Sequence, residues 1–244
     1  MKQLKIIAHN YRGVILLKAP SSIKMLASVT SVEEALIVLD AGIDMIDLKN
    51  PAEGTLGALD HALVKDIVQA VNHRSSVSAT IGDLPMQASL IVDATKSMLD
   101  TSVDIVKIGF FGQSHHAQCL DALRTLTRES KLIAVLFADE SPDLRLLPVI
   151  AQAGFYGVML DTANKSHGHL QTHLNLNSLN RFVIMAKNLG LEAGLAGSLQ
   201  MNHIPDLLKT HPSYLGFRAA LCGKAQRTSH LEPDKVRAIK KMFS

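Results

Sequence analysis

The feature that most constrains the fold is a regular alternation of short apolar runs with longer amphipathic segments, which begins near residue 23. Strands alternating with helices predict a parallel sheet with crossover connections. Eight such units favour closure into a (β/α)8 barrel of the α/β class, and an open doubly wound sheet with one more strand is the alternative. We expect the strands at 24–29, 45–49, 77–82, 105–110, 131–137, 156–161, 192–197 and 214–221.

The length of 244 residues suits one barrel domain, which we place at 23–244 behind an N-terminal extension, 1–22. Aromatic residues make up only 4% of the chain and Trp is absent, as expected for parallel strands rich in Val, Ile, Leu and Ala. Among the helices, we expect one to end at Gly42 and another to run from Pro142 to Gly154.

Several function classes are disfavoured by composition. The net charge is only +3 and no basic run is interleaved with aromatic residues, so we expect no nucleic-acid partner. No apolar run is long enough to span a membrane and no secretory cleavage site follows the first apolar stretches, which favours a cytoplasmic protein. Cys119 and Cys222 lie far apart and are expected to be reduced. Histidine and carboxylate spacings predict no metal site. Barrels of this kind often associate through exposed helices, so we expect a homo-oligomer.

Three lysines, Lys49, Lys107 and Lys165, are spaced 58 residues apart. This interval corresponds to two strand-and-helix units, which places the lysines on every second strand. Alternate strands of a barrel contribute side chains to the same interior layer, so the three amines should converge. Neighbouring ammonium groups lower one another's pKa and burial adds to the effect. The sequence therefore predicts a neutral amine that can attack a carbonyl group.

The alternation within each strand indicates which polar residues face inward. Asp47 and Lys49 share one face of their strand, while Lys107 and Asp161 occupy the corresponding face of two later strands. Polar residues at the carboxyl ends of barrel strands are typical of catalytic sites. A satisfied structural network is the alternative interpretation, but three lysines and two aspartates on strands of one parity favour chemistry.

A phosphate site is predicted after the last two strands, where barrels often bind this group. There Gly197 permits close approach of the backbone, Ser198 offers an amide and a hydroxyl, and a helix beginning near residue 199 would add its dipole. Gly216 and Arg218 on the final strand would supply backbone and guanidinium contacts. Lys224 and Arg227 are candidates to extend this site, although exposed loop cations are the default interpretation of both.

Five motifs in order carry a resemblance to a known family: DLKNPAEGTLGA, VDIVKIGFFG, MLDTANKSHG, GLAGSL and GFRAALCG. From about Lys24 to its end, the chain resembles the (5-formylfuran-3-yl)methyl phosphate synthases, also called 4-(hydroxymethyl)-2-furancarboxaldehyde-phosphate synthases. The first 22 residues fall outside the resemblance.

The resemblance implies a barrel lyase that converts two molecules of glyceraldehyde 3-phosphate into the furan phosphate, with loss of phosphate and water. The product would serve the synthesis of methanofuran-type one-carbon carriers, and no metal or organic cofactor is implied. The family's D-x-K-N-P motif matches Asp47 and the imine-forming Lys49, its V-K-x-G strand matches Lys107, and its D-T-A-x-K motif matches Asp161 and Lys165.

Two other functions stay open on the residues alone. One is a different aldolase or isomerase of phosphorylated sugars that uses the same lysine imine. The other is a non-catalytic barrel that binds a phosphorylated metabolite.

Overall fold

In the computed structural model, which describes residues 22–112 and 114–243, eight parallel strands close into a barrel in the order β1 to β8. The predicted barrel class is confirmed, and the open sheet is wrong. All but one residue of the expected extension, 1–22, lies outside the described residues. The strands are β1 (Lys24–Val29), β2 (Met45–Leu48), β3 (Ser76–Thr80), β4 (Ile105–Gly109), β5 (Lys131–Phe137), β6 (Gly157–Asp161), β7 (Glu192–Leu195) and β8 (Tyr214–Phe217).

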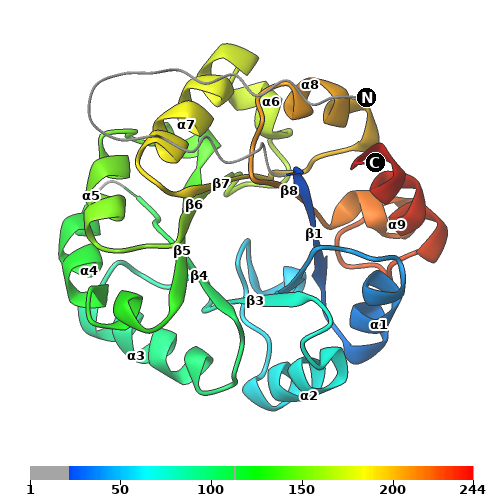
Figure 1. Cartoon of the computed structure of the whole chain (residues 1–244), viewed down its shortest axis with the longest axis horizontal. Coiled ribbons are helices and arrows are strands. Elements are labelled where there is room, and N and C mark those ends of the chain that lie inside the picture. The colour runs from blue at the N-terminus through cyan, green and yellow to red at the C-terminus, as the bar shows by residue number, and fades with distance from the viewer. Residues whose placement is uncertain (1–21, 113, 244) are drawn as a thin grey trace, which may run out of the picture.

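Helices surround the barrel, as Figure 1 shows in a view down its axis. Each connection carries a helix that packs its apolar face against the outer surface of the strands, which satisfies the handedness and packing of β/α units. They are α1 (Val32–Asp40), α2 (His61–Val71), α3 (Ala88–Leu99), α4 (His116–Leu123), α5 (Leu146–Gln152), α6 (Leu170–His173), α7 (Leu176–Asn188), α8 (Ile204–Leu208) and α9 (Pro233–Lys240).

The strand alternation divides the core in two. The outward residues of the strands, among them Ile46, Leu48, Val106 and Ile108, pack beneath the helices in the larger apolar cluster. A smaller cluster, which includes Met45, Ile105, Ile133 and Tyr214, fills the inside of the barrel. Because apolar side chains close this part of the interior, the inward polar residues are displaced toward the carboxyl ends of the strands.

Several strands end before their predicted bounds, and β7 and β8 do so where the backbone leaves the extended conformation. β7 ends before Gly197 and Ser198, whose φ angles are 109° and 50°. β8 ends where the 3-10 turn Ala219–Leu221 begins. The residues at both departures, Gly197, Ser198 and Arg218, line the cavity in which the phosphate site is expected.

The predicted helix from Pro142 is wrong in its start, since α5 begins only at Leu146. The Asp143 carboxylate accepts a hydrogen bond from the Arg145 amide at 2.9 Å and folds the preceding residues into a turn. The end of the other expected helix is confirmed, because α1 stops at Asp40 and Gly42 follows with a positive φ.

Candidate active site

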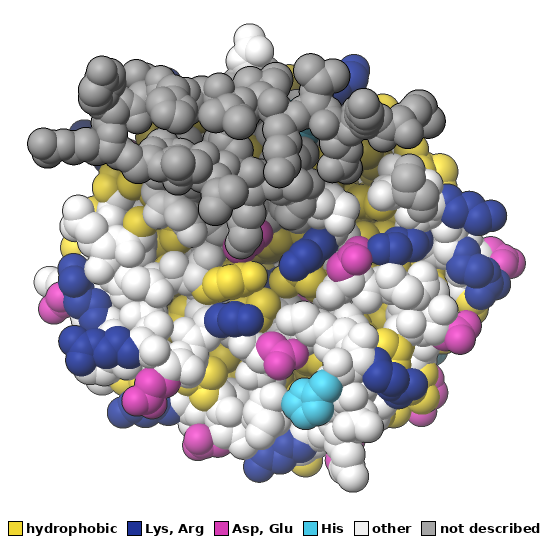
Figure 2. All heavy atoms as spheres, viewed as in Figure 1, with side chains coloured by type: hydrophobic (Ala, Val, Ile, Leu, Met, Phe, Trp, Pro, Cys, Tyr) yellow, Lys and Arg dark blue, Asp and Glu magenta, His cyan; other side chains and the backbone are white. Residues whose placement is uncertain are grey.

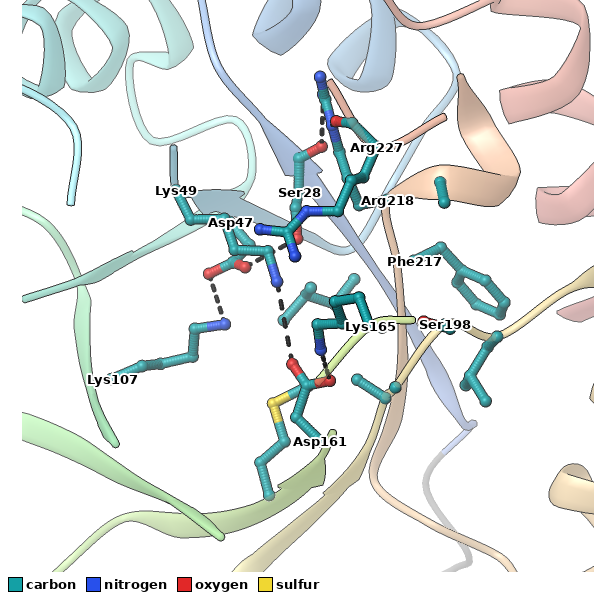
Figure 3. A pocket seen from close by; sticks show the side chains of 17 residues that line it. Ser28, Asp47, Lys49, Lys107, Asp161, Lys165, Ser198, Phe217, Arg218 and Arg227 are labelled. Atoms are coloured by element: carbon teal, nitrogen blue, oxygen red, sulfur yellow. Dashed lines mark hydrogen bonds and ion pairs between the residues drawn. The ribbon is translucent and has the colours of Figure 1, made fainter. Parts of the chain in front are cut away.

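A cavity opens at the carboxyl ends of the strands, and Figure 3 shows the lysine and aspartate side chains converging in it. Among the described residues that line it, five are cationic and two are carboxylates. Lys107 lies on β4, whereas Lys49 directly follows β2 and Lys165 lies in the loop after β6. The three lysines thus belong to every second strand-and-helix unit, but only Lys107 is on a strand. The excess of positive charge suits an anionic ligand.

Asp47 and Lys107 form the innermost ion pair. Lys107 Nζ lies 2.7 Å from Asp47 Oδ1, and the exposed fractions of the two side chains are 1% and 0%. Ser78 Oγ donates to Asp47 Oδ1 at 2.8 Å, and Ser28 Oγ donates to Oδ2 at 2.9 Å. Burial tends to raise the pKa of Asp47, but the Lys107 and Lys49 ammonium groups lower it below its usual range. Both oxygens of this carboxylate are therefore engaged within the protein.

Asp161 lies between the other two lysines. Lys165 Nζ is 2.5 Å from Asp161 Oδ1, while Lys49 Nζ is 3.8 Å from Oδ2. Burial tends to raise the pKa of Asp161, yet Lys165 and Lys49 outweigh it and lower this pKa to about 2. Asp161 is thus the carboxylate nearest to Lys49, but it lies closer to the Lys165 ammonium group than to that of Lys49.

Lys49 is the amine with the weakest compensation of its charge. Burial lowers its pKa to about 8, Asp161 opposes the change, and Lys165 and then Lys107 add to it. The sequence predicts that neighbouring ammonium groups lower this pKa and that burial adds to the effect. In the structure burial is the largest cause, and Lys165 lowers the pKa more than Lys107 does. The Lys107 charge is offset by Asp47 at 2.7 Å, which explains its smaller effect.

Gly197, Ser198, Gly216 and Arg218 all line the same cavity. A Cβ on Gly216 would approach Met159 Cε to 3.0 Å, so the absence of a side chain keeps this part of the cavity open. The expected helix near residue 199 is wrong, because a 3-10 turn begins at Met201 and the short α8 at Ile204. The anion contacts that these residues can offer are thus the amides and the Ser198 hydroxyl.

The guanidinium of Arg218 is fully used by other parts of the chain. It pairs with Glu34 at 2.5 Å and also donates to the carbonyl oxygens of Ser28, Arg227 and Ser229. These bonds, with a second one to Glu34, occupy all the N–H donors of the side chain. Its predicted contact with phosphate stays a prediction, and the main-chain amide is the group left for it.

Sequence reasoning missed Ser28, which projects from β1 onto Asp47. The alternation of β1 contained the signal, because Leu26 and Ser28 share the inward face of KMLASV.

No group of three or more His, Cys, Asp or Glu side chains among residues 22–112 and 114–243 is arranged to hold a metal. In the same part of the chain, no helix is both long and apolar enough to cross a membrane. Figure 2 shows acidic and basic side chains interspersed around the face that it presents.

Residues 25–240 match the family model described as 4-HFC-P synthase. The chain belongs to this family. A 4-HFC-P synthase relative from Methanosarcina mazei, named (5-formylfuran-3-yl)methyl phosphate synthase, is 33% identical over 84% of this chain and 93% of its own. A protein from Methylorubrum extorquens that carries the same name provisionally is 37% identical over 87% of this chain and 88% of its own. The predicted family is confirmed, and the chain is an enzyme of the lyase type.

Solved structures share the fold of this chain at much lower identity. Phosphoribosyl anthranilate isomerase from Thermotoga maritima superposes with a TM-score of 0.66 at 12% identity, over 91% of this chain and 98% of its own. This likeness concerns the barrel alone.

Proposed function

We propose that the protein condenses two molecules of glyceraldehyde 3-phosphate into (5-formylfuran-3-yl)methyl phosphate through an imine on Lys49. The atoms balance when one phosphate and two waters are released. The observation that carries the proposal is the buried Lys49 amine, whose pKa of about 8 leaves about a tenth of it neutral at pH 7, far more than for an ordinary lysine. The names of the curated relatives support the product.

The Lys49 amine attacks the aldehyde carbon of the first molecule and water leaves as the imine forms. The cationic nitrogen then accepts the electrons of the neighbouring C–H bond, which gives an enamine. The enamine carbon forms a C–C bond with the aldehyde of the second molecule. Loss of phosphate, ring closure and dehydration yield the aromatic furan, and hydrolysis of the imine frees Lys49.

Of the two carboxylates, Asp161 is better placed to move protons beside Lys49. Its Oδ2 lies 3.8 Å from Lys49 Nζ, whereas each oxygen of Asp47 already accepts from Ser28, Ser78 or Lys107. Lys165 on the other oxygen of Asp161 supplies a proton source. Asp47 and Lys107 then act as a fixed charge pair that keeps the interior of the site ordered.

The substrate phosphates lie against the cationic and amide-rich side of the cavity. Lys165 offers an ammonium group, while Gly197, Ser198, Gly216 and the Arg218 amide offer main-chain contacts. The cationic excess of the cavity is the property that supports this placement.

The decisive test is mass spectrometry of the purified protein incubated with glyceraldehyde 3-phosphate alone, without added metal or cofactor. We expect the furan aldehyde phosphate with an equal amount of free phosphate. Substrate that stays intact or is only isomerised would refute the furan synthase activity and favour another imine-forming barrel.

The role of Lys49 is tested separately by borohydride reduction in the presence of substrate. We expect a reduced adduct on the peptide that contains Lys49, and none in Lys49→Arg, because a guanidinium keeps the charge but does not deprotonate. Lys96→Arg, at an exposed position on α3, is the matched control and should retain both adduct and activity.

A further inference from the structure

The loop that follows Lys49, residues 50–57, is tied across the mouth of the barrel. β2 and β6 stand on opposite sides of an eight-stranded barrel, so a contact between their loops has to cross the opening. The Thr55 hydroxyl donates to the Ala163 carbonyl oxygen in the loop after β6. Thr55 is only 6% exposed and Leu56 only 1%. We call residues 50–57 the β2 loop.

Arg227 holds the same loop from a third direction. It lies in the segment after β8 and lines the cavity, and its Nη2 donates to the carbonyl oxygens of Pro51, at 2.7 Å, and Gly54. The main chain of Arg227 is itself fixed, because Arg218 Nε donates to its carbonyl oxygen at 2.8 Å. Figure 3 shows both arginines along one side of the cavity. The buried Arg218–Glu34 pair therefore anchors the segment from which Arg227 reaches the β2 loop.

Carboxylates of two neighbouring loops hold the segments on both sides of the Thr55–Ala163 bond in place. Asp83, after β3, accepts from the Thr55 and Leu56 amides at 2.7 Å each. Asp139, after β5, accepts in the same way from the Ala163 and Asn164 amides at 2.7 Å each. Each carboxylate thus holds two successive amides beside the Thr55–Ala163 bond, so that both sides of the contact are kept in place.

The closed arrangement leaves little room around Lys49. The cavity has a volume of about 40 Å³, which holds about three water molecules. It opens at the carboxyl ends of the strands, so the segments that cross this opening control access to Lys49. Asp83 ties the β2 loop only to its neighbour after β3. The bonds of Thr55 and Arg227 instead join it across the opening, to the segments after β6 and β8.

We propose that Thr55 and Arg227 are positioning residues that gate the Lys49 site, by holding the β2 loop closed over the imine during turnover. The inference rests on the proposed function of Lys49. Closure keeps water from the imine and the enamine, which protects reactive intermediates from side reactions.

An open gate permits one particular side reaction, the loss of phosphate from the enamine to give methylglyoxal. In the enamine of glyceraldehyde 3-phosphate, the nitrogen lone pair can re-form C=N while the C1=C2 electrons form a C2=C3 bond and phosphate leaves from C3 with the C–O electron pair. The enol so formed takes up a proton at C3 and becomes a methyl ketone. Hydrolysis of the resulting imine frees the Lys49 amine and releases methylglyoxal. The balance is one glyceraldehyde 3-phosphate to one methylglyoxal and one phosphate, so the leak is measurable beside the furan product.

The test compares Arg227→Met with Thr55→Val, because the second variant disturbs the gate without changing the charge of the cavity. The matched controls are Arg145→Met, at an exposed arginine, and Thr127→Val, which loses a hydrogen bond to Ala153 away from the site. Circular dichroism and thermal melting establish that all four variants are folded.

The first readout is the pH dependence of reductive methylation at Lys49 by formaldehyde and cyanoborohydride, followed by peptide mass spectrometry. Formaldehyde is small and neutral, so its entry does not depend on the Arg227 charge. We expect a midpoint near pH 8 in the wild type, and a rise of about one unit in both gate variants, because an opened mouth restores hydration of the ammonium group. The controls should match the wild type.

The second readout is the ratio of methylglyoxal to furan product, which should increase severalfold in both gate variants after subtraction of the decay without enzyme. If only Arg227→Met changes either quantity, Arg227 acts through its charge and the gate is refuted. Unchanged values in both variants refute it as well. A wild type that forms no furan product would refute the proposed function, whereas the methylation midpoints would still report on the gate.

Discussion

Replacement of Lys49 by Met is expected to stabilise the fold at neutral pH while it abolishes catalysis. The pKa of Lys49 is lowered from 10.5 to about 8, so the folded state disfavours its charged form. Because each unit of pKa shift corresponds to about 1.4 kcal/mol, the charge costs the folded protein about 3 kcal/mol below pH 8. Methionine fills a similar space without a charge, and the variant should recover most of this free energy.

The sign of the pH dependence makes the prediction sharp. A lysine with a depressed pKa in the folded state binds fewer protons than in the unfolded state between pH 8 and 10.5. The wild type therefore gains stability relative to the variant as pH rises through this interval. The advantage of Lys49→Met should decline from about 3 kcal/mol at pH 7 to about 1 kcal/mol at pH 10.

Urea denaturation at these two pH values measures the difference in the free energy of unfolding. Lys96→Met, at an exposed position, should stay within about 0.5 kcal/mol of the wild type at both. Lys49→Arg should not gain the stability, because its charge persists. A difference between Lys49→Met and the wild type that is the same at pH 7 and pH 10 would refute the argument from burial of the charge.

Three further changes test other parts of the site. Gly54→Ala should destabilise the protein by about 1–3 kcal/mol in urea and raise KM, because residue 54 has a φ of 125° and its Cβ would lie 2.2 Å from Asp83 Oδ2. Arg218→Met should cost about 3–5 kcal/mol in the same assay, since it leaves the buried Glu34 carboxylate without its cation; a loss below 1 kcal/mol would mean that the pair is not essential to the fold. Because the pKa of Asp161 is held at about 2, its ion pairs contribute stability above pH 4 that is lost as pH falls toward 2. That contribution is about 2 kcal/mol, and acid titrations of wild type and Asp161→Asn should therefore differ in this interval.

The strand parity of the site could be predicted from sequence because it depends only on local alternation. Asp47 and Lys49 are separated by two positions, so any strand through them projects both side chains to one face. The spacing of Lys49, Lys107 and Lys165 extends the same reasoning to alternate strands. Closure of the barrel then brings the residues together, as the ion pairs with Asp47 and Asp161 show.

The use of each polar group could not be predicted, because it depends on contacts between distant segments. Arg218 follows β8 where a phosphate contact is expected, but Glu34 from the first turn of α1 takes its guanidinium. The position of Glu34 in sequence is already explained by the favourable placement of acidic residues at a helix start. Nothing local in either segment signals the pair. For Arg227 the default interpretation, an exposed loop cation, is wrong, because the residue is half-buried against the β2 loop and lines the cavity.

The contrast between Lys49 and Lys107 explains how one site can hold one reactive amine among three. Lys107 is buried more deeply, but Asp47 lies 2.7 Å from its amine, and Ser28 and Ser78 fix that carboxylate in place. Lys49 faces a carboxylate whose closer partner is Lys165, so its own charge is compensated only at 3.8 Å. Burial of a poorly compensated ammonium group favours the neutral form. In the proposed mechanism, Lys165 therefore has a role besides contact with phosphate: by occupying the Asp161 carboxylate, it keeps Lys49 available as a nucleophile.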